Sequence, residues 1–152
     1  MPATDRVTMQ GHTVSRRIRD MLRWVEAQTG LTILIAQGSY RGTNAAAASG
    51  STHDREAIDL RVGHLTTAQR VKLVRGLKDA GFAAWYRAAL PGVWGPHIHA
   101  LPIGGDLSSS AKGQVRAYDA GRDGLTGNRI DRTYRPDPRV KWDFDRKRPV
   151  RR

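Results

Sequence analysis

The 152-residue sequence contains no cysteine. Disulfide bonds are therefore excluded, and so are the thiolate ligands that structural zinc sites commonly use. The sequence also has no run that approaches the roughly 20 apolar residues of a membrane-spanning helix. Its first residues, Met1 to Arg6, show no charged segment followed by an apolar stretch, which an export signal would need. We therefore expect a protein that is made in the cytoplasm without an export signal.

Acidic residues are scarce relative to basic ones. The sequence has 26 Lys and Arg against 14 Asp and Glu, a formal net charge of +12 at pH 7. Residues 129–152 contain ten Lys or Arg and four Asp or Glu, so this segment contributes +6, half of the total. Such a segment attracts polyanions, including nucleic acid, teichoic acids and anionic lipid surfaces. A solvated tail without a partner fits the composition equally well.

These features suggest one domain with a tail. At 152 residues the chain can bury a workable core. We expect the domain to span residues 1–125 and a basic, partly irregular tail to span residues 126–152. Trp142 and Phe144 lie within the tail and indicate that part of it packs on the domain.

Hydrophobic periodicity in the first half predicts a helix, a strand and a loop. Apolar residues recur at helical spacing over residues 13–28, and Gly30 ends that helix. Residues 31–36 form a short apolar run rich in branched side chains, which favours a buried strand. Residues 42–50 contain four consecutive alanines but are bracketed by glycine, so we expect a loop with at most one helical turn.

The second half continues the pattern of an α+β protein. Apolar and polar residues alternate around Asp59, which favours a half-buried strand with Asp59 facing away from Ile58 and Leu60. Thr66 or Thr67 can cap a helix that ends at Gly81. The strand around Asp59 is expected over residues 56–62, and two further strands are expected over residues 82–87 and 94–101. The helix capped by Thr66 or Thr67 should reach about residue 80, and a third helix should span residues 109–120.

Four side chains in this part of the chain can bind a metal ion: His53, Asp59, His97 and His99. Three of them could occupy three corners of a zinc tetrahedron and leave the fourth corner to water. Two neutral imidazoles and one carboxylate leave the zinc ion with a residual positive charge, which lowers the pKa of its bound water toward about 7. His97 and His99 share one face of the expected strand, so one can bind the metal while the other handles a proton.

The segments around these residues resemble a known peptidase family. They look like the zinc peptidases that include D-Ala-D-Ala carboxypeptidases, bacterial L-alanyl-D-glutamate peptidases and the hedgehog signalling domain. The likeness is strong to peptidase domains of actinobacterial proteins and phage endolysins, and it covers about residues 32–105 and more loosely 107–125. The segments that carry it are Gly38-Ser39-Tyr40-Arg41, Ser51-Thr52-His53, Ala57-Ile58-Asp59, Gly81-Phe82-Ala83-Ala84-Trp85-Tyr86-Arg87 and Trp94-Gly95-Pro96-His97-Ile98-His99.

The resemblance implies a fold and a set of roles. The fold would be a small antiparallel sheet that carries one zinc ion and is flanked by helices. His53, Asp59 and His99 would be the zinc ligands, and His97 would be the catalytic partner of the water. Arg41 would bind the substrate and help to polarise the scissile carbonyl, a task suited to a guanidinium that stays charged and offers several donors.

The sequence departs from the family at one point. The family's step from histidine to aspartate is usually one residue longer than the step from His53 to Asp59, which leaves Asp54 or Glu56 as possible substitute ligands. Two further histidines, His12 and His64, are expected to be surface or hydrogen-bonded residues. Two tryptophans, Trp85 and Trp94, are expected in the core or in the wall of the cavity.

The resemblance implies zinc-dependent hydrolysis of peptide bonds in the stem peptides or cross-bridges of bacterial peptidoglycan. The enzyme would be a monomer of the endolysin type, acting at the cell wall and released by a holin if encoded by a phage. Its basic tail would contact anionic wall polymers, and no specific nucleic acid is expected. Two alternatives remain open. One is a non-catalytic, zinc-containing module that binds cell wall, and the other is a nucleic-acid-binding protein, which only the charge supports.

Overall fold

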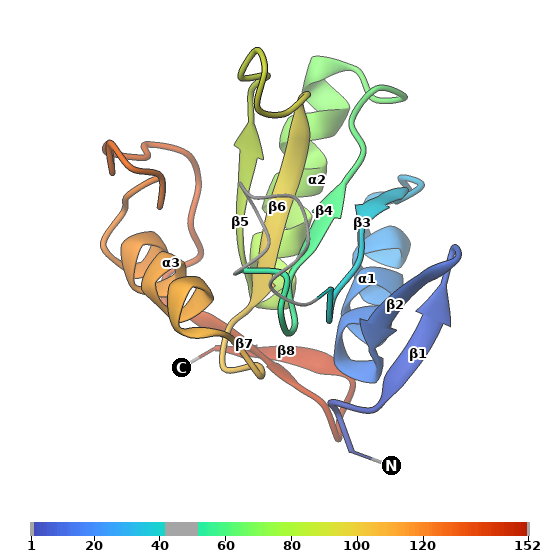
Figure 1. The fold of residues 1–152 in the computed structure, drawn as a ribbon. Helices are drawn as coiled ribbons and strands as arrows, with labels where there is room; N and C mark the ends of the chain where they lie inside the picture. The colour runs from blue at the N-terminus through green and yellow to red at the C-terminus, as the bar shows by residue number, and fades with distance from the viewer. Residues whose placement is uncertain (1, 42–51, 152) are drawn as a thin grey trace.

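The structure is a computed structural model that describes residues 2–41 and 52–151. It is an α+β fold built on a four-stranded antiparallel sheet with the strand order β3-β4-β6-β5 (Figure 1). The strands are β3 (Ile35–Gln37), β4 (Ile58–Leu60), β5 (Phe82–Arg87) and β6 (His97–Pro102). The predicted α+β class and antiparallel sheet are therefore confirmed. The loop expected over residues 42–50 lies outside the described residues.

Two helices cover one face of the sheet, and their ends follow the expected capping chemistry. The helix α1 (Arg16–Thr29) begins after Ser15, whose hydroxyl accepts a hydrogen bond from the backbone of Ile18, and ends at Gly30. The helix α2 (Thr67–Ala80) begins with a reciprocal capping box between Thr66 and Gln69. Periodicity predicted both helices, α1 with its stop at Gly30 and α2 with a threonine cap and its stop at Gly81.

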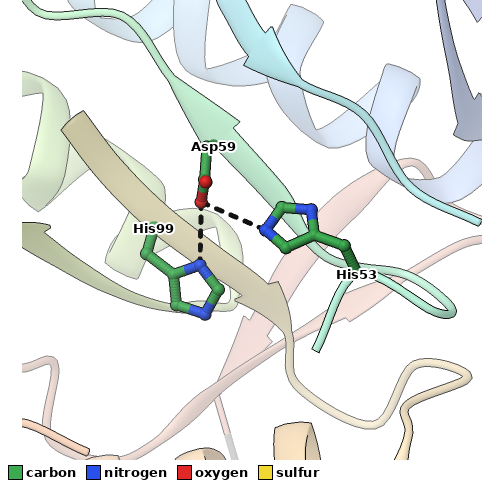
Figure 2. Close-up of side chains that lie close together, drawn as sticks. All are labelled: His53, Asp59 and His99. Carbon is green, nitrogen blue, oxygen red and sulfur yellow. Dashed lines mark hydrogen bonds and ion pairs between the residues drawn. The ribbon is translucent and has the colours of Figure 1, made fainter. Parts of the chain in front are cut away.

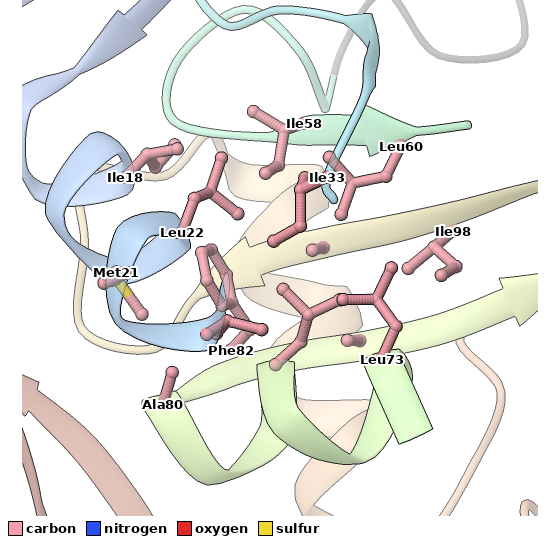
Figure 3. Close-up of a cluster of buried hydrophobic side chains, with 14 of the residues drawn as sticks. Ile18, Met21, Leu22, Ile33, Ile58, Leu60, Leu73, Ala80, Phe82 and Ile98 are labelled. Carbon is pink, nitrogen blue, oxygen red and sulfur yellow. The ribbon is translucent and has the colours of Figure 1, made fainter. Parts of the chain in front are cut away.

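The main core lies between these helices and the sheet. Alternation along the strands sends every second side chain to this face, so strand residues meet the apolar stripes of both helices. The side chains are almost completely buried and interdigitate (Figure 3). This core includes Ile18, Met21, Leu22, Ile33, Ile58, Leu60, Leu73, Ala80, Phe82 and Ile98.

A smaller apolar cluster covers the opposite face of the sheet. The helix α3 (Ser109–Asp119) starts after Ser108, which caps the backbone of Ala111. Its buried residues Ala111, Val115 and Tyr118 pack in one cluster with Trp85 of β5 and Leu101 of β6. The sheet is thus covered on both faces, and Trp85 and Leu101, which point toward α3, are buried.

Two short hairpins were not foreseen from the sequence. The first joins β1 (Arg6–Met9) to β2 (His12–Ser15), so α1 begins at Arg16 rather than at residue 13. The second joins β7 (Val140–Asp143) to β8 (Arg148–Arg151) in the basic tail, which is irregular before Val140.

Part of the tail packs on the domain, as predicted from its aromatic residues. Trp142 is only 7% exposed and meets Trp24 edge to face, with 6.3 Å between the ring centroids. Phe144 packs against the same core. Upstream, the buried ammonium of Lys78 donates hydrogen bonds to the hydroxyl of Thr133 and the carbonyl of Tyr134, which ties the irregular segment to α2.

The strands are shorter than predicted at several ends. In the first case, residues 31–34 lead into β3 without joining it, because pairing with β4 starts at Ile35. In the second, Trp94 belongs to a turn in which it pairs with Leu90, and β6 starts only after Pro96, which has no backbone N–H to donate. None of the helices in the described residues combines the length and apolar character that a membrane span requires.

Candidate metal centre

Strand register places Asp59, His99 and Trp85 on the face of the sheet that points toward α3. Asp59 of β4 lies opposite His99 of β6, and Trp85 of β5 lies opposite His99 on its other side. Ile58 and Leu60 point into the main core, so Asp59 must point the other way, as predicted from the alternation. His53 approaches the same point from the segment that precedes β4, as Figure 2 shows.

His53, Asp59 and His99 form a buried group with the dimensions of a metal site. The Oδ1 atom of Asp59 lies 3.2 Å from Nε2 of His53 and 2.9 Å from Nδ1 of His99 (Figure 2). One potential ligand atom from each residue lies within 4.8 Å of the others, and all three residues are buried. Ligand atoms held about 2.0–2.1 Å from a tetrahedral zinc ion are about 3.3 Å apart, so these separations fit such an ion with little adjustment.

The hydrogen bonds of His53 leave its metal-facing nitrogen without a partner. Its Nδ1 atom lies 2.9 Å from the carbonyl oxygen of Gly38 and must donate a proton to it, since a carbonyl can only accept. In the neutral ring the lone pair is then on Nε2. This atom is fully buried and has no hydrogen-bond partner among the described residues. A buried acceptor without a donor is costly, and a bound cation would satisfy it.

His99 is oriented in a comparable way by a residue of α3. Its Nε2 atom lies 2.8 Å from Oε1 of Gln114 and donates to it, which leaves the lone pair of the neutral ring on Nδ1. Nδ1 lies 2.9 Å from Oδ1 of Asp59, which is a hydrogen bond when Nδ1 carries the proton and a contact between two acceptors when Nε2 carries it. Two acceptors at this distance repel each other unless a cation lies between or beside them. Ligand histidines are commonly held by such outer hydrogen bonds, so both imidazoles fit a metal ion.

The electrostatics of the group favour a divalent cation. Burial raises the pKa of the Asp59 carboxyl, but its close contacts with the imidazoles of His53 and His99 outweigh this effect and hold the pKa well below its usual range. Burial lowers the pKa of His99, which favours the neutral ring. A permanent carboxylate beside a neutral imidazole is the state in which both act as ligands.

An open cleft of about 360 Å³ gives access to Asp59 and His99. His97 also lines it, with its Nδ1 atom donating to the carbonyl of Gly95 and its Nε2 atom 3.9 Å from Oδ2 of Asp59. Trp94 packs edge-on against the His97 ring at 5.7 Å between centroids and forms part of the wall. The structure therefore places His97 beside the three candidate ligands, where it can reach a molecule in the cleft.

Arg41, the other residue given a catalytic role by the resemblance, is not among the described residues that line this cleft. It is exposed, and its backbone N–H donates to the carbonyl oxygen of His53. This bond helps to fix the segment that carries His53. Among the residues that the structure describes, the arginine that lines the cleft is Arg87, at the end of β5.

Neither alternative ligand from the sequence joins the group. Glu56 is buried but forms an ion pair with Arg17 at 3.7 Å, and the metal-like group found in the described residues contains neither it nor Asp54. His53 thus reaches Asp59 despite the short spacing. His12 and His64 also lie outside the group, and His64 instead hydrogen-bonds the carbonyl of Thr32.

Two residues that line the cleft, Gln114 and Arg87, were missed in the sequence. A signal existed for Gln114, because it lies three residues after Ala111 and four before Tyr118, on the helix face that packs toward the sheet. Arg87 shares its face of β5 with Trp85, and its backbone pairs with that of His97. Alternation indicates that face, but the sequence alone does not say which residues lie opposite it.

No family model, no curated protein and no solved structure matches this chain.

Proposed function

We propose that this protein is a zinc-dependent peptidase that hydrolyses peptide bonds in the stem peptides or cross-bridges of bacterial peptidoglycan. The observation that carries the proposal is the buried group of His53, Asp59 and His99 at a cleft that a third histidine, His97, also lines. The motif resemblance supports the family and the substrate. The excess of basic residues suits a wall rich in anionic polymers.

The donor set supports zinc as the metal. Two imidazole nitrogens and one carboxylate oxygen are the protein ligands of many catalytic zinc sites, which keep a fourth position open. When bound, zinc would supply a Lewis acid and a water of lowered pKa in the cleft. Gln114 and the carbonyl of Gly38 would hold the two imidazoles in orientation.

The other residues of the cleft provide positioning and proton transfer. The Nδ1–H of His97 is held by the carbonyl of Gly95, so its Nε2 atom is the one free to take a proton from the attacking water and to return it to the leaving amine. Trp94 restricts the His97 ring from one side. The walls of the cleft include the apolar residues Val93 and Leu125, which can contact the side chains of a peptide.

We propose that the protein acts at the bacterial cell wall after synthesis in the cytoplasm. The hairpin β7–β8 and the segment before it would contact anionic wall polymers. Their basic residues include Arg139, Lys141 and Arg148, which are exposed.

A metal and activity assay on matched variants tests the proposal. We expect the purified protein to contain about one zinc per chain by elemental analysis and to release soluble muropeptides from purified peptidoglycan, with loss of release after chelation. His99→Ala should lose both metal and activity, whereas His97→Ala should keep the metal and lose most of the activity. His64→Ala is the control, because His64 is exposed and outside the group.

Mass spectrometry of the released fragments would identify the bond that is cut. Release of muropeptides that continues after treatment with a chelator, or in His99→Ala, would contradict the proposal. Stoichiometric zinc binding and cell-wall binding without any release would instead support a non-catalytic module.

A further inference from the structure

Arg87 is a buried cation in the wall of the metal cleft. It lies at the end of β5 and is only 5% exposed. The cleft of about 360 Å³ is lined by Arg87 together with Asp59, His97 and His99. Arg87 also lines a second, larger groove of about 980 Å³ between α2, β5 and the segment that follows α3. It therefore stands at the boundary between the two cavities.

The described residues provide a hydrogen-bond acceptor for only part of the Arg87 guanidinium. Its Nη1 atom donates to the backbone carbonyl of Asp123, and its cationic carbon lies 4.7 Å from the centre of the Trp85 ring. Its Nη2 atom is buried and has no hydrogen-bond partner among the described residues. Within the same residues, Arg87 forms no ion pair with a carboxylate.

This arrangement is unusual for a buried charge. Burying a guanidinium without an opposite charge is costly, and buried arginines are normally paired with carboxylates or phosphates. A carbonyl and an aromatic ring are neutral, so they compensate only partly. Burial lowers the pKa of Arg87 to about 10, which still leaves it charged at neutral pH. The carboxylates of Asp123, Asp59 and Asp131 act on Arg87 from a distance and form no ion pair with it, so an anion in the cleft would supply the direct contact that they do not.

We propose that Arg87 is a substrate-binding residue that holds a carboxylate of the substrate beside the metal centre. A carboxylate matches the planar fork of a guanidinium and carries a single charge, which suits a cleft that already contains the Asp59 carboxylate. The apolar side chains of Val93 and Leu125 in the same wall suit the aliphatic part of an amino acid. The peptide nature of the substrate rests on the proposed function, whereas the need for an anion rests on Arg87 itself.

The carboxylate could come from two sources, the C-terminus of a peptide or an acidic side chain. Three probes separate them: acetyl-L-Lys-D-Ala-D-Ala with a free carboxylate, the same peptide as its C-terminal amide, and a C-terminal amide in which the last residue is D-Glu. The final peptide bond in each is replaced by a ketomethylene group, so that the probe is not cleaved during the measurement. Binding to the zinc-loaded 152-residue protein is measured by calorimetry.

We expect the wild-type protein to bind one carboxylate probe about 10- to 100-fold more tightly than the uncharged amide, as a charge-assisted bidentate contact provides. Arg87→Gln should bind all three probes equally, and Arg87→Lys should retain part of the preference. The matched control is Arg70→Gln. This variant removes the same charge from a residue that stacks on Tyr86 and lines only the second groove, so it should keep the wild-type ratio.

The ratio of two affinities within one variant separates anion binding from a structural role, because a folding defect weakens both probes alike. A wild-type protein without a preference for a carboxylate, or without detectable binding of any probe, would overturn the inference. A preference that survives in Arg87→Gln would overturn it as well. If the carboxylate preference depends on Arg87 but no peptidoglycan is cleaved, the inference stands and the proposed function fails.

Discussion

Glu56, a buried carboxyl three residues before Asp59, allows a quantitative prediction of how stability depends on pH. Its side chain is completely buried, and its nearest cation is Arg17, with 3.7 Å between Nη1 and Oε2. The backbone of Gly105 packs so closely that a Cβ atom there would lie 2.6 Å from Oε2. Burial raises the pKa of Glu56 from 4.5 to about 7, against the opposing effects of Arg17 and Ser15. The carboxyl therefore loses its proton at higher pH in the folded protein than in the unfolded chain.

The direction of this shift fixes the pH dependence of stability. Below about pH 4.5 both states hold the proton, so Glu56 causes no ionisation penalty. Between about pH 4.5 and pH 7 the unfolded state binds fewer protons than the folded state, so the free energy of unfolding falls as the pH rises. Above about pH 7 the loss is complete and amounts to about 3 kcal/mol, because each pH unit of difference corresponds to about 1.4 kcal/mol.

The substitution Glu56→Gln removes the ionisable group and keeps the shape of the side chain. We expect it to stabilise the protein by up to about 3 kcal/mol at pH 8.5, a rise of about 6–12 °C in Tm, and to have little effect at pH 4. The measurement is urea unfolding of both proteins across this pH range in the presence of a chelator. The control Asp145→Asn, at an exposed carboxylate, should show no comparable pH-dependent gain. Equal stabilities at pH 8.5, or a gain that persists unchanged at pH 4, would refute the reasoning.

Three further predictions concern the metal, its outer hydrogen bonds and the tail. Zinc at about 100 times its Kd should raise the free energy of unfolding by about 2.7 kcal/mol, so calorimetric scans that give the same Tm with zinc and with chelator would argue against the site. Gln114→Ala should weaken zinc binding about 10- to 100-fold by freeing the His99 ring, and an unchanged affinity in a competition titration would exclude that role. Trp142→Ala should destabilise the protein by about 3–5 kcal/mol in denaturant unfolding, and a loss below about 1 kcal/mol would show that the tail does not depend on this contact.

Local patterns predicted the helices and the faces of the strands well. The capping box of Thr66 and Gln69 and the stop at Gly81 act within a few residues, so α2 was correctly placed at both ends. The alternation around Asp59 likewise indicated the side of the strand on which the carboxylate would lie. These features depend on backbone geometry and neighbouring residues, which a sequence displays directly.

The two hairpins escaped prediction because their strands are only four residues long, and in each hairpin one strand, β2 or β8, lacks the alternation of apolar and polar residues that its partner shows. Their stability comes from packing on distant elements, as the contact of Trp142 with Trp24 shows. Aromatic residues in a basic tail therefore indicated that the tail packs, but not the form in which it packs.

By itself, the sequence determined which residue types were available for a metal and on which strand faces they would lie. Only the tertiary structure decided that His53 meets Asp59 and His99, that Gln114 from α3 holds one imidazole, and that Arg87 rather than Arg41 lines the cleft. The physical reason is that local periodicity fixes the direction of a side chain along its own element. The elements that pack beside it are selected by burial and backbone pairing across the whole chain.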